Sequence, residues 1–145
     1  MRVGILILLM VVAASCENND TKQLTTNWNA SQIEQKRDKV KEVMAIHDEA
    51  MPWMEDTREL SKQLKKLQTD SISDYMRTLI SSSLVELEEA DEAMMGWMRS
   101  YKEPADTGSV DMAISYLESE RIKVEEVRAI MSSAINNAKQ LVSNE

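Results

Sequence analysis

A short segment rich in methionine and tryptophan occurs twice in this chain and holds the residues best suited to chemistry. Residues 48–54 read Asp-Glu-Ala-Met-Pro-Trp-Met, and residues 91–98 repeat that order with one residue inserted. The only histidine, His47, directly precedes the first copy. Thioether sulfur and imidazole nitrogen together favour Cu(I) over harder metal ions. These residue types therefore permit a soft-metal site.

The spacing of these residues suits metal chelation from one helix face. His47 and Met51 are four residues apart, so a helix would place both side chains on the same side. Met94 or Met98 could complete the Cu(I) ligand set from a neighbouring helix, and the indole of Trp97 could shield the ion. We call the predicted site the Met-Trp-His layer; it consists of Met44, His47, Met51, Met94, Trp97 and Met98.

Two other interpretations of this layer are open. Methionine fills irregular gaps and packs well on indole rings, so the layer could be the core of a protein that has no Phe. His47 would then be a core histidine that is hydrogen-bonded to Glu120 or Asp91. Methionine-rich faces also serve as adaptable docking surfaces for protein partners, and Pro52 and Gly96 would let the helices part locally.

The sequence contains no recognisable catalytic machinery. The only thiol is Cys16, and His47 has no Ser or Cys partner at a known signature. A Gly-rich phosphate loop is missing. A di-iron carboxylate bundle needs two Glu-x-x-His segments, which a chain with one histidine cannot provide. We therefore expect a protein that is not an enzyme.

The layer must be positioned by long helices. The 145 residues allow one domain, and a composition with three glycines, two prolines and no Phe favours helices over strands. Apolar residues recur at steps of three and four over three spans, about 31–68, 72–102 and 109–142. Such helices, joined by short turns, pack side by side. We expect an all-α, up-down-up three-helix bundle over residues 31–145, with a single coiled-coil rod as the alternative.

Local signals refine the ends of these helices. Ser31 and Glu34 have the spacing of a capping box at the start of the first helix, Ser71 is placed to cap the second, and Ser109 the third. Pro52 removes an amide hydrogen from the middle of the first helix, so we expect a kink there.

The register of the bundle predicts which residues meet. In an antiparallel pair that turns near residue 70, residues whose numbers sum to roughly 140 to 144 lie at the same height. His47 then lies opposite the stretch from Met94 to Trp97, and the two copies of the repeated segment face each other. A second turn, near residue 106, adds three residues of the last helix to this height: Leu117, Glu120 and Arg121.

The first sixteen residues predict export and lipid attachment. A short positive start precedes an apolar run over residues 5–12, which is too short to span a bilayer. Residues 13–16 read Ala-Ala-Ser-Cys, which resembles the lipobox of bacterial lipoproteins. In that family the chain is cut before the cysteine, which is then acylated. The resemblance implies a signal peptide over residues 1–15 and a lipidated Cys16. The residues from Cys16 to residue 30 are polar and rich in Asn and Thr, so we expect them to form a flexible tether.

Charge makes this lipid anchor the expected route to the membrane. The formal net charge is -8 and the sequence lacks a Lys/Arg cluster, which argues against nucleic-acid binding and against electrostatic docking on anionic lipid. Residues 17–20, Glu-Asn-Asn-Asp, resemble the acidic export tags of Bacteroidetes lipoproteins displayed on the outer surface. We expect a lipid-anchored protein of the bacterial cell envelope, at the outer membrane, that binds a protein partner or has a structural role.

The repeated segments carry a further resemblance. Residues 46–52 read Ile-His-Asp-Glu-Ala-Met-Pro, and residues 90–98 read Ala-Asp-Glu-Ala-Met-Met-Gly-Trp-Met. Both resemble segments of a family of small Bacteroidetes lipoproteins that combine a lipobox with a helical body, some of which bear the label viral A-type inclusion protein. The resemblance implies a bacterial lipoprotein and brings no activity with it.

Overall fold

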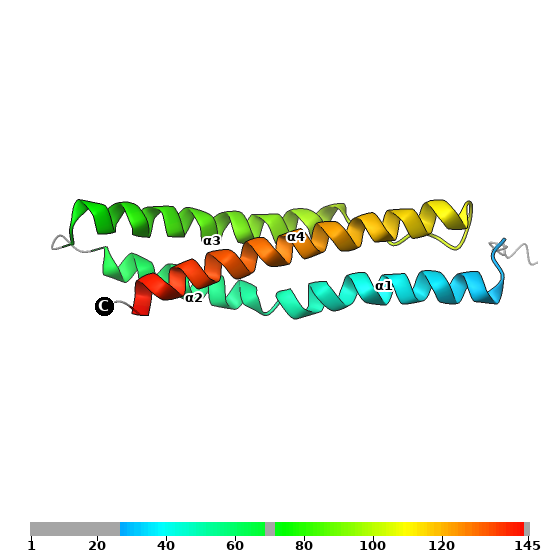
Figure 1. Cartoon of the computed structure of the whole chain (residues 1–145), viewed down its shortest axis with the longest axis horizontal. Helices are drawn as coiled ribbons and strands as arrows, with labels where there is room; N and C mark the ends of the chain where they lie inside the picture. The colour runs from blue at the N-terminus through cyan, green and yellow to red at the C-terminus, as the bar shows by residue number, and fades with distance from the viewer. Residues whose placement is uncertain (1–26, 69–71, 144–145) are drawn as a thin grey trace, which may run out of the picture.

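Four helices make up the three arms of a helical bundle. The computed structural model describes residues 27–68 and 72–143. The helices are α1 (Ala30–Ala50), α2 (Trp53–Leu67), α3 (Asp74–Ser100) and α4 (Val110–Ser143). In Figure 1, α1 and α2 follow each other in one arm, α3 runs back beside them, and α4 returns in the direction of α1. The all-α bundle is confirmed, and the single-rod alternative is wrong because the arms pack on one another.

The first arm breaks at Pro52, where the sequence predicts a kink. Proline has no N–H to donate to the carbonyl of Asp48, so α1 ends at Ala50 and α2 begins at Trp53. Met51 and Pro52 nevertheless keep α-helical dihedral angles, and the N–H of Met51 bonds to the His47 carbonyl at 2.8 Å. The arm is therefore interrupted over residues 51–52, and α2 follows α1 along it (Figure 1).

The start of α1 differs from the expected one. Asn29, rather than Ser31, caps the helix: its side chain accepts from the Gln32 N–H at 2.9 Å, and the Gln32 side chain accepts from the Asn29 N–H at 2.9 Å. Asn29 has the extended backbone that this reciprocal capping box requires. Glu34, the expected partner of Ser31, instead pairs with Arg37 on the surface.

Side-chain caps also mark the starts of α3 and α4. The Ser73 hydroxyl accepts from the Met76 N–H at 3.2 Å, whereas the expected cap, Ser71, lies outside the described residues. The predicted cap at Ser109 is confirmed, because its hydroxyl accepts from the Met112 N–H at 3.3 Å. Each cap satisfies a backbone donor that the first helical turn leaves free.

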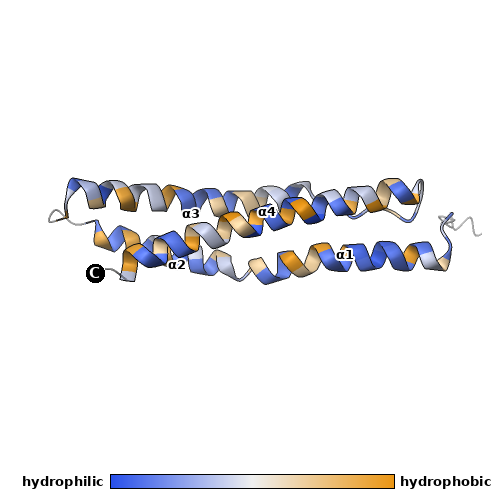
Figure 2. Ribbon diagram, viewed as in Figure 1, coloured by the Kyte–Doolittle hydropathy of each residue, from blue (hydrophilic) through white to orange (hydrophobic). Residues whose placement is uncertain are grey.

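All three arms contribute to one apolar core. Figure 2 shows hydrophobic and hydrophilic bands alternating along the helices, as expected of helices with one buried face. α4 contacts each of the other three helices, and α1 packs chiefly on α4. The largest apolar side chains that are fully buried come from every predicted stripe: Val43, Leu64, Ile80, Leu87, Met94, Leu117, Val124 and Met131.

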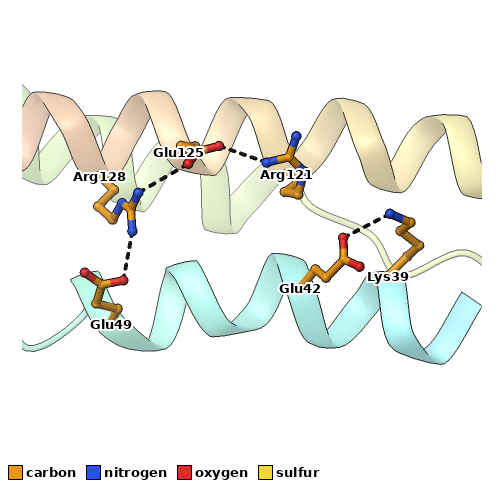
Figure 3. Close-up of polar contacts among 6 residues, drawn as sticks. All are labelled: Lys39, Glu42, Glu49, Arg121, Glu125 and Arg128. Atoms are coloured by element: carbon orange, nitrogen blue, oxygen red, sulfur yellow. Dashed lines mark hydrogen bonds and ion pairs between the residues drawn. The ribbon is translucent and has the colours of Figure 1, made fainter.

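Polar side chains also link the arms. Arg128 of α4 donates to Glu49 of α1 at 2.9 Å, and Glu125 lies between Arg128 and Arg121 along α4 (Figure 3). On α2, the buried Thr57 hydroxyl donates to Asp91 of α3 at 2.6 Å.

Among the helices that the structure describes, none has the length and apolar character needed to cross a membrane.

The N-terminal signal peptide, Cys16 and most of the expected tether lie outside the described residues. Trp28, near the end of that tether, is buried, and its indole N–H donates to the Gly108 carbonyl at 3.0 Å. The folded part of the chain therefore begins before residue 31. We call the end of the bundle that holds Trp28 and the α3–α4 connection, residues 101–109, the proximal end.

Candidate functional site

The predicted Met-Trp-His layer is assembled in part. Met94 is fully buried and Trp97 is 6% exposed, while Met44 and Met51 are half-buried against the same core. Met98 differs from the expectation, because 38% of it is exposed. It lies beside the buried stripe of α3, which runs along the helix through Met94 and Trp97. Three of the four proposed metal ligands therefore remain at the core, and Met98 faces outward.

His47 lies where the register predicts. Its ring centroid is 5.6 Å from that of Trp97, and the two ring planes meet at 37°. The hydrogen-bond partner differs from both expected ones: Nδ1 lies 2.9 Å from the Asp48 carboxylate, the next residue along the chain. Asp91 is instead bonded to Thr57, and Glu120 to Trp97. A neighbour in sequence is therefore the partner of Nδ1, and the ring contacts α3 by packing on Trp97.

Glu120 is the polar centre of the layer. It is 3% exposed, and its two carboxylate oxygens have separate donors. The Trp97 indole N–H donates to one at 3.0 Å, and the Lys123 ammonium to the other at 2.7 Å. This hydrogen bond raises the pKa of Lys123. A buried carboxylate is tolerated when its oxygens are satisfied in this way. Of the two polar candidates on the last helix, Glu120 therefore enters the layer, whereas Arg121 bonds to Glu125.

Tyr101 extends the aromatic packing by one helical turn. Its ring stacks on Trp97 with a centroid distance of 5.1 Å and an angle of 25°. The hydroxyl oxygen is buried and has no hydrogen-bond partner among the residues described. Burial raises the pKa of this phenol, and the charge of Glu103 adds to the shift. We call His47, Trp97, Tyr101 and Glu120 the Trp97 cluster. Tyr101 shares the apolar spacing of α3, which is the signal that places it beside Trp97.

Lys36 is a buried cation at the α3–α4 connection that the sequence patterns did not identify. It is buried, and its ammonium bonds to the Pro104 carbonyl at 2.9 Å, to Asp106 at 2.6 Å and to Glu103 at 2.9 Å. Burial by itself lowers the pKa of Lys36, but the bonds to Asp106 and Glu103 outweigh it and the pKa is raised. Lys36 follows Ile33 and precedes Val40 in the inward stripe of α1, and that position is the signal that could have found it.

The described residues contain no group of three or more His, Cys, Asp or Glu side chains placed to hold a metal ion. Methionine is not one of these residue types, and the Cu(I) set of His47, Met51, Met94 and Met98 stays a hypothesis. Comparison with known proteins returned no family model, no curated protein and no solved structure that matches this chain.

Gly96 gives a first test of whether this layer needs a flexible helix. We expect Gly96→Ala to raise the free energy of unfolding by about 0.5–1 kcal/mol, because alanine favours the helix interior over glycine. An added Cβ would meet only the Arg99 guanidinium, at 3.8 Å, which is ordinary contact. Urea unfolding followed by circular dichroism measures the change.

Gly108 supplies the matched control. It adopts a φ of +86°, so Gly108→Ala should destabilise the protein although nothing lies within 4 Å of the added carbon. A loss of stability in Gly96→Ala would contradict the prediction and would mean that the added Cβ does not fit against its neighbours.

Tyr101 gives a second test, with pH as the variable. We expect Tyr101→Phe to stabilise the protein by about 1 kcal/mol near neutral pH, because it removes a buried hydroxyl without a partner in the described structure. The pKa of the phenol is higher in the folded state than in the unfolded state, so ionisation favours unfolding. Stability is therefore unaffected by this titration below the unfolded pKa, about 10, and is lost as pH rises through the folded pKa. The wild type should therefore lose more stability than the variant above about pH 10.

Unfolding midpoints measured at neutral and alkaline pH test both parts of this expectation. Tyr75→Phe is the control, because Tyr75 is 73% exposed. Marked destabilisation by Tyr101→Phe at neutral pH would mean that the hydroxyl makes a bond in solution.

Proposed function

We propose that this chain is a lipid-anchored helical module of the bacterial cell envelope that acts by structural support or partner binding rather than by catalysis. The observation that supports it is the use of polar groups in the Trp97 cluster. The indole N–H of Trp97 and the carboxylate of Glu120 bond to each other across α3 and α4. Groups that hold arms together in this way are committed to the fold.

The remaining groups of the cluster favour the same proposal. Catalysis by acid–base chemistry needs a titratable group within reach of a substrate. His47 is engaged with Asp48 and packed on Trp97, and the second oxygen of Glu120 accepts from Lys123. The bond between Trp97 and Glu120 ties α3 to α4, which is what a supporting or spacing module requires.

The lipid anchor is the part of the proposal that sequence carries. It rests on Ala-Ala-Ser-Cys at residues 13–16 and on the apolar run before it. Two or three acyl chains would hold an acidic protein on a membrane, since each buried methylene contributes about 0.8 kcal/mol. The outer membrane is the expected site.

Mass spectrometry of the protein purified from bacterial membranes tests the anchor. We expect an N-terminus at Cys16 that carries acyl chains, and we expect Cys16→Ser to abolish both cleavage before residue 16 and membrane retention. A mature protein with a free Cys16 thiol, or with cleavage elsewhere, would refute the lipoprotein assignment.

Hydrogen exchange distinguishes support from binding through an opening surface. If the layer is a permanent core, amides around Met94 and Trp97 exchange slowly and in step with the rest of α3. Fast local exchange there, relative to the N-terminal half of α3, would favour a docking surface formed by parting of the helices. Gly96→Ala should suppress such opening and provides the control.

Cu(I) binding is the second candidate function, and one geometric observation favours it. The Met51 N–H bonds to the His47 carbonyl, so their side chains emerge one regular helical turn apart. The indole of Trp97 also lies against His47, where it would shield a bound ion. We expect anaerobic titration with Cu(I) against a competing chelator to show one tightly held ion if this candidate is right. His47→Ala and Met51→Ala should abolish that binding, and Met112→Ala, outside the layer, should not; a stoichiometry unchanged by the first two rules the site out.

A further inference from the structure

The proximal end of the bundle has an open apolar hollow that the proposed function does not use. The hollow has a volume of about 610 Å³ and lies where the α3–α4 connection meets the first turns of α4. Its walls include Pro104, Ala105, Met112, Ala113 and Tyr116. Met112 is 75% exposed, although removing a large apolar side chain from water lowers the free energy. This surface therefore suits an apolar or partly apolar neighbour.

The course of the chain places this surface near the expected lipid anchor. Trp28 is buried at the proximal end, where its indole N–H bonds to the Gly108 carbonyl, so the described part of the chain begins at this end. Residues 17–26 separate Cys16 from the described structure, and ten residues span at most about 35 Å when fully extended. An acylated Cys16 would keep the proximal end within that distance of the lipid surface.

The opposite end of the bundle lies roughly the length of α3 away from the proximal end. That helix has 27 residues and is about 40 Å long. Tyr75, in the first turn of α3, is 73% exposed, which is close to the 75% of Met112. Figure 1 shows that the starts of α3 and α4 lie at opposite ends of the bundle. The two side chains therefore form a natural pair, alike in exposure and different in their distance from the proximal end.

Ion pairing lowers the electrostatic cost of bringing this end to a membrane. The chain carries a net charge of -8, so an acidic surface would be repelled by anionic lipid. At the proximal end, however, Lys36 pairs with both Glu103 and Asp106. Lys102 adds an exposed positive charge beside the hollow. Lys36 thus offsets part of the charge of the two connection carboxylates, while Asp111, which precedes Met112, remains an exposed negative charge.

We propose that the proximal end rests on the lipid surface, with Met112 and the apolar wall of the hollow among the lipid headgroups, so that the three arms project away from the membrane. This inference depends on the proposed acylation of Cys16 and adds the orientation of the bundle to it. The α3 start and the C-terminal end of α4 then face away from the membrane, where they are free to meet other envelope components.

Fluorescence from paired single-cysteine variants tests this orientation. Met112→Cys and Tyr75→Cys are prepared in the full-length lipoprotein, in which acylation blocks the thiol of Cys16. Each is labelled with an environment-sensitive fluorophore and bound to vesicles of phosphatidylethanolamine and phosphatidylglycerol, with and without spin-labelled lipid. We expect a blue shift and quenching by the spin-labelled lipid at position 112, and neither change at position 75.

The other outcomes overturn the inference in distinguishable ways. Quenching at both positions means that the bundle lies flat on the membrane. Quenching at neither position, in protein that still floats with the vesicles, means that the anchor holds but the proximal end does not touch lipid. A blue shift at position 112 without quenching means that a second copy or another protein surface covers Met112. Protein that does not float and carries no acyl mass at Cys16 refutes the anchor, and the orientation falls with it.

Discussion

Replacing Trp97 with alanine is expected to lower the free energy of unfolding by about 3–5 kcal/mol. Three losses combine in this variant. The buried indole leaves a cavity in the core, and the ring contacts with His47 and Tyr101 disappear. Glu120, which is 3% exposed, also loses one of its two donors. A buried carboxylate oxygen without a donor is costly because it was removed from water on folding.

Trp53→Ala is the matched control for this prediction. Trp53 occupies the corresponding position in the first copy of the repeated segment, but it is only partly buried. Its removal should therefore cost less than that of Trp97. Urea unfolding followed by circular dichroism measures both variants without relying on tryptophan emission. Equal costs, or a larger cost at Trp53, would mean that the Trp97 cluster is not the centre of the core.

Trp97→Phe separates the two kinds of loss. Phenylalanine keeps most of the ring packing and removes the N–H that donates to Glu120. We expect this change to retain much of the packing energy and to cost about 1–3 kcal/mol, the range for an unsatisfied buried polar group. Combining it with Glu120→Gln in a double-mutant cycle measures the coupling between the two side chains.

Replacing Met94 with alanine is the second change with a large expected effect, a loss of about 2–5 kcal/mol in the free energy of unfolding. Met94 is fully buried in the C-terminal half of α3, between the buried residues Ala90 and Trp97 of the same helix face. Truncation removes three heavy atoms from this core, and the surrounding helices can collapse only partly into the space. The cost is therefore larger than the lost transfer free energy alone.

The adjacent methionine provides the control for Met94. Met95 is 38% exposed, so Met95→Ala should change stability by no more than about 0.5 kcal/mol. The two variants have the same composition and differ by one helical position, which rotates the side chain by about 100°. Similar unfolding midpoints for both would contradict the assignment of the buried face of α3.

The repeated segments show how one residue changes the outcome of a similar sequence. In the first copy, Pro52 lacks an N–H, and the arm divides into α1 and α2. In the second, Gly96 keeps its N–H, and α3 continues through it to Ser100. An α-helix therefore tolerates the flexible Gly96, whereas Pro52, which has no N–H to donate, interrupts it. The expectation that the helices part locally is therefore better tested at Gly96, where the helix is intact.

Local patterning was sufficient to predict the arms of the bundle and most of its core. Apolar steps of three and four identified the buried stripes, and Pro52 marked the break in the first arm. The turn positions also placed His47 opposite Trp97, which the ring contact confirms. These features follow from spacing along a single helix and from the height at which consecutive arms pass each other, and both can be read from residue numbers.

Polar pairing, in contrast, was decided by the tertiary structure. Residue spacing left Glu120 and Arg121 as alternatives, and it did not identify Asp48 as the partner of His47 or Lys36 as a buried cation. It also placed Met98 in the layer, whereas the side chain faces outward. Such outcomes depend on the rotation of each helix about its axis and on its offset along its neighbours. Those quantities are set by the packing of all three arms together, so no single helix contains the information.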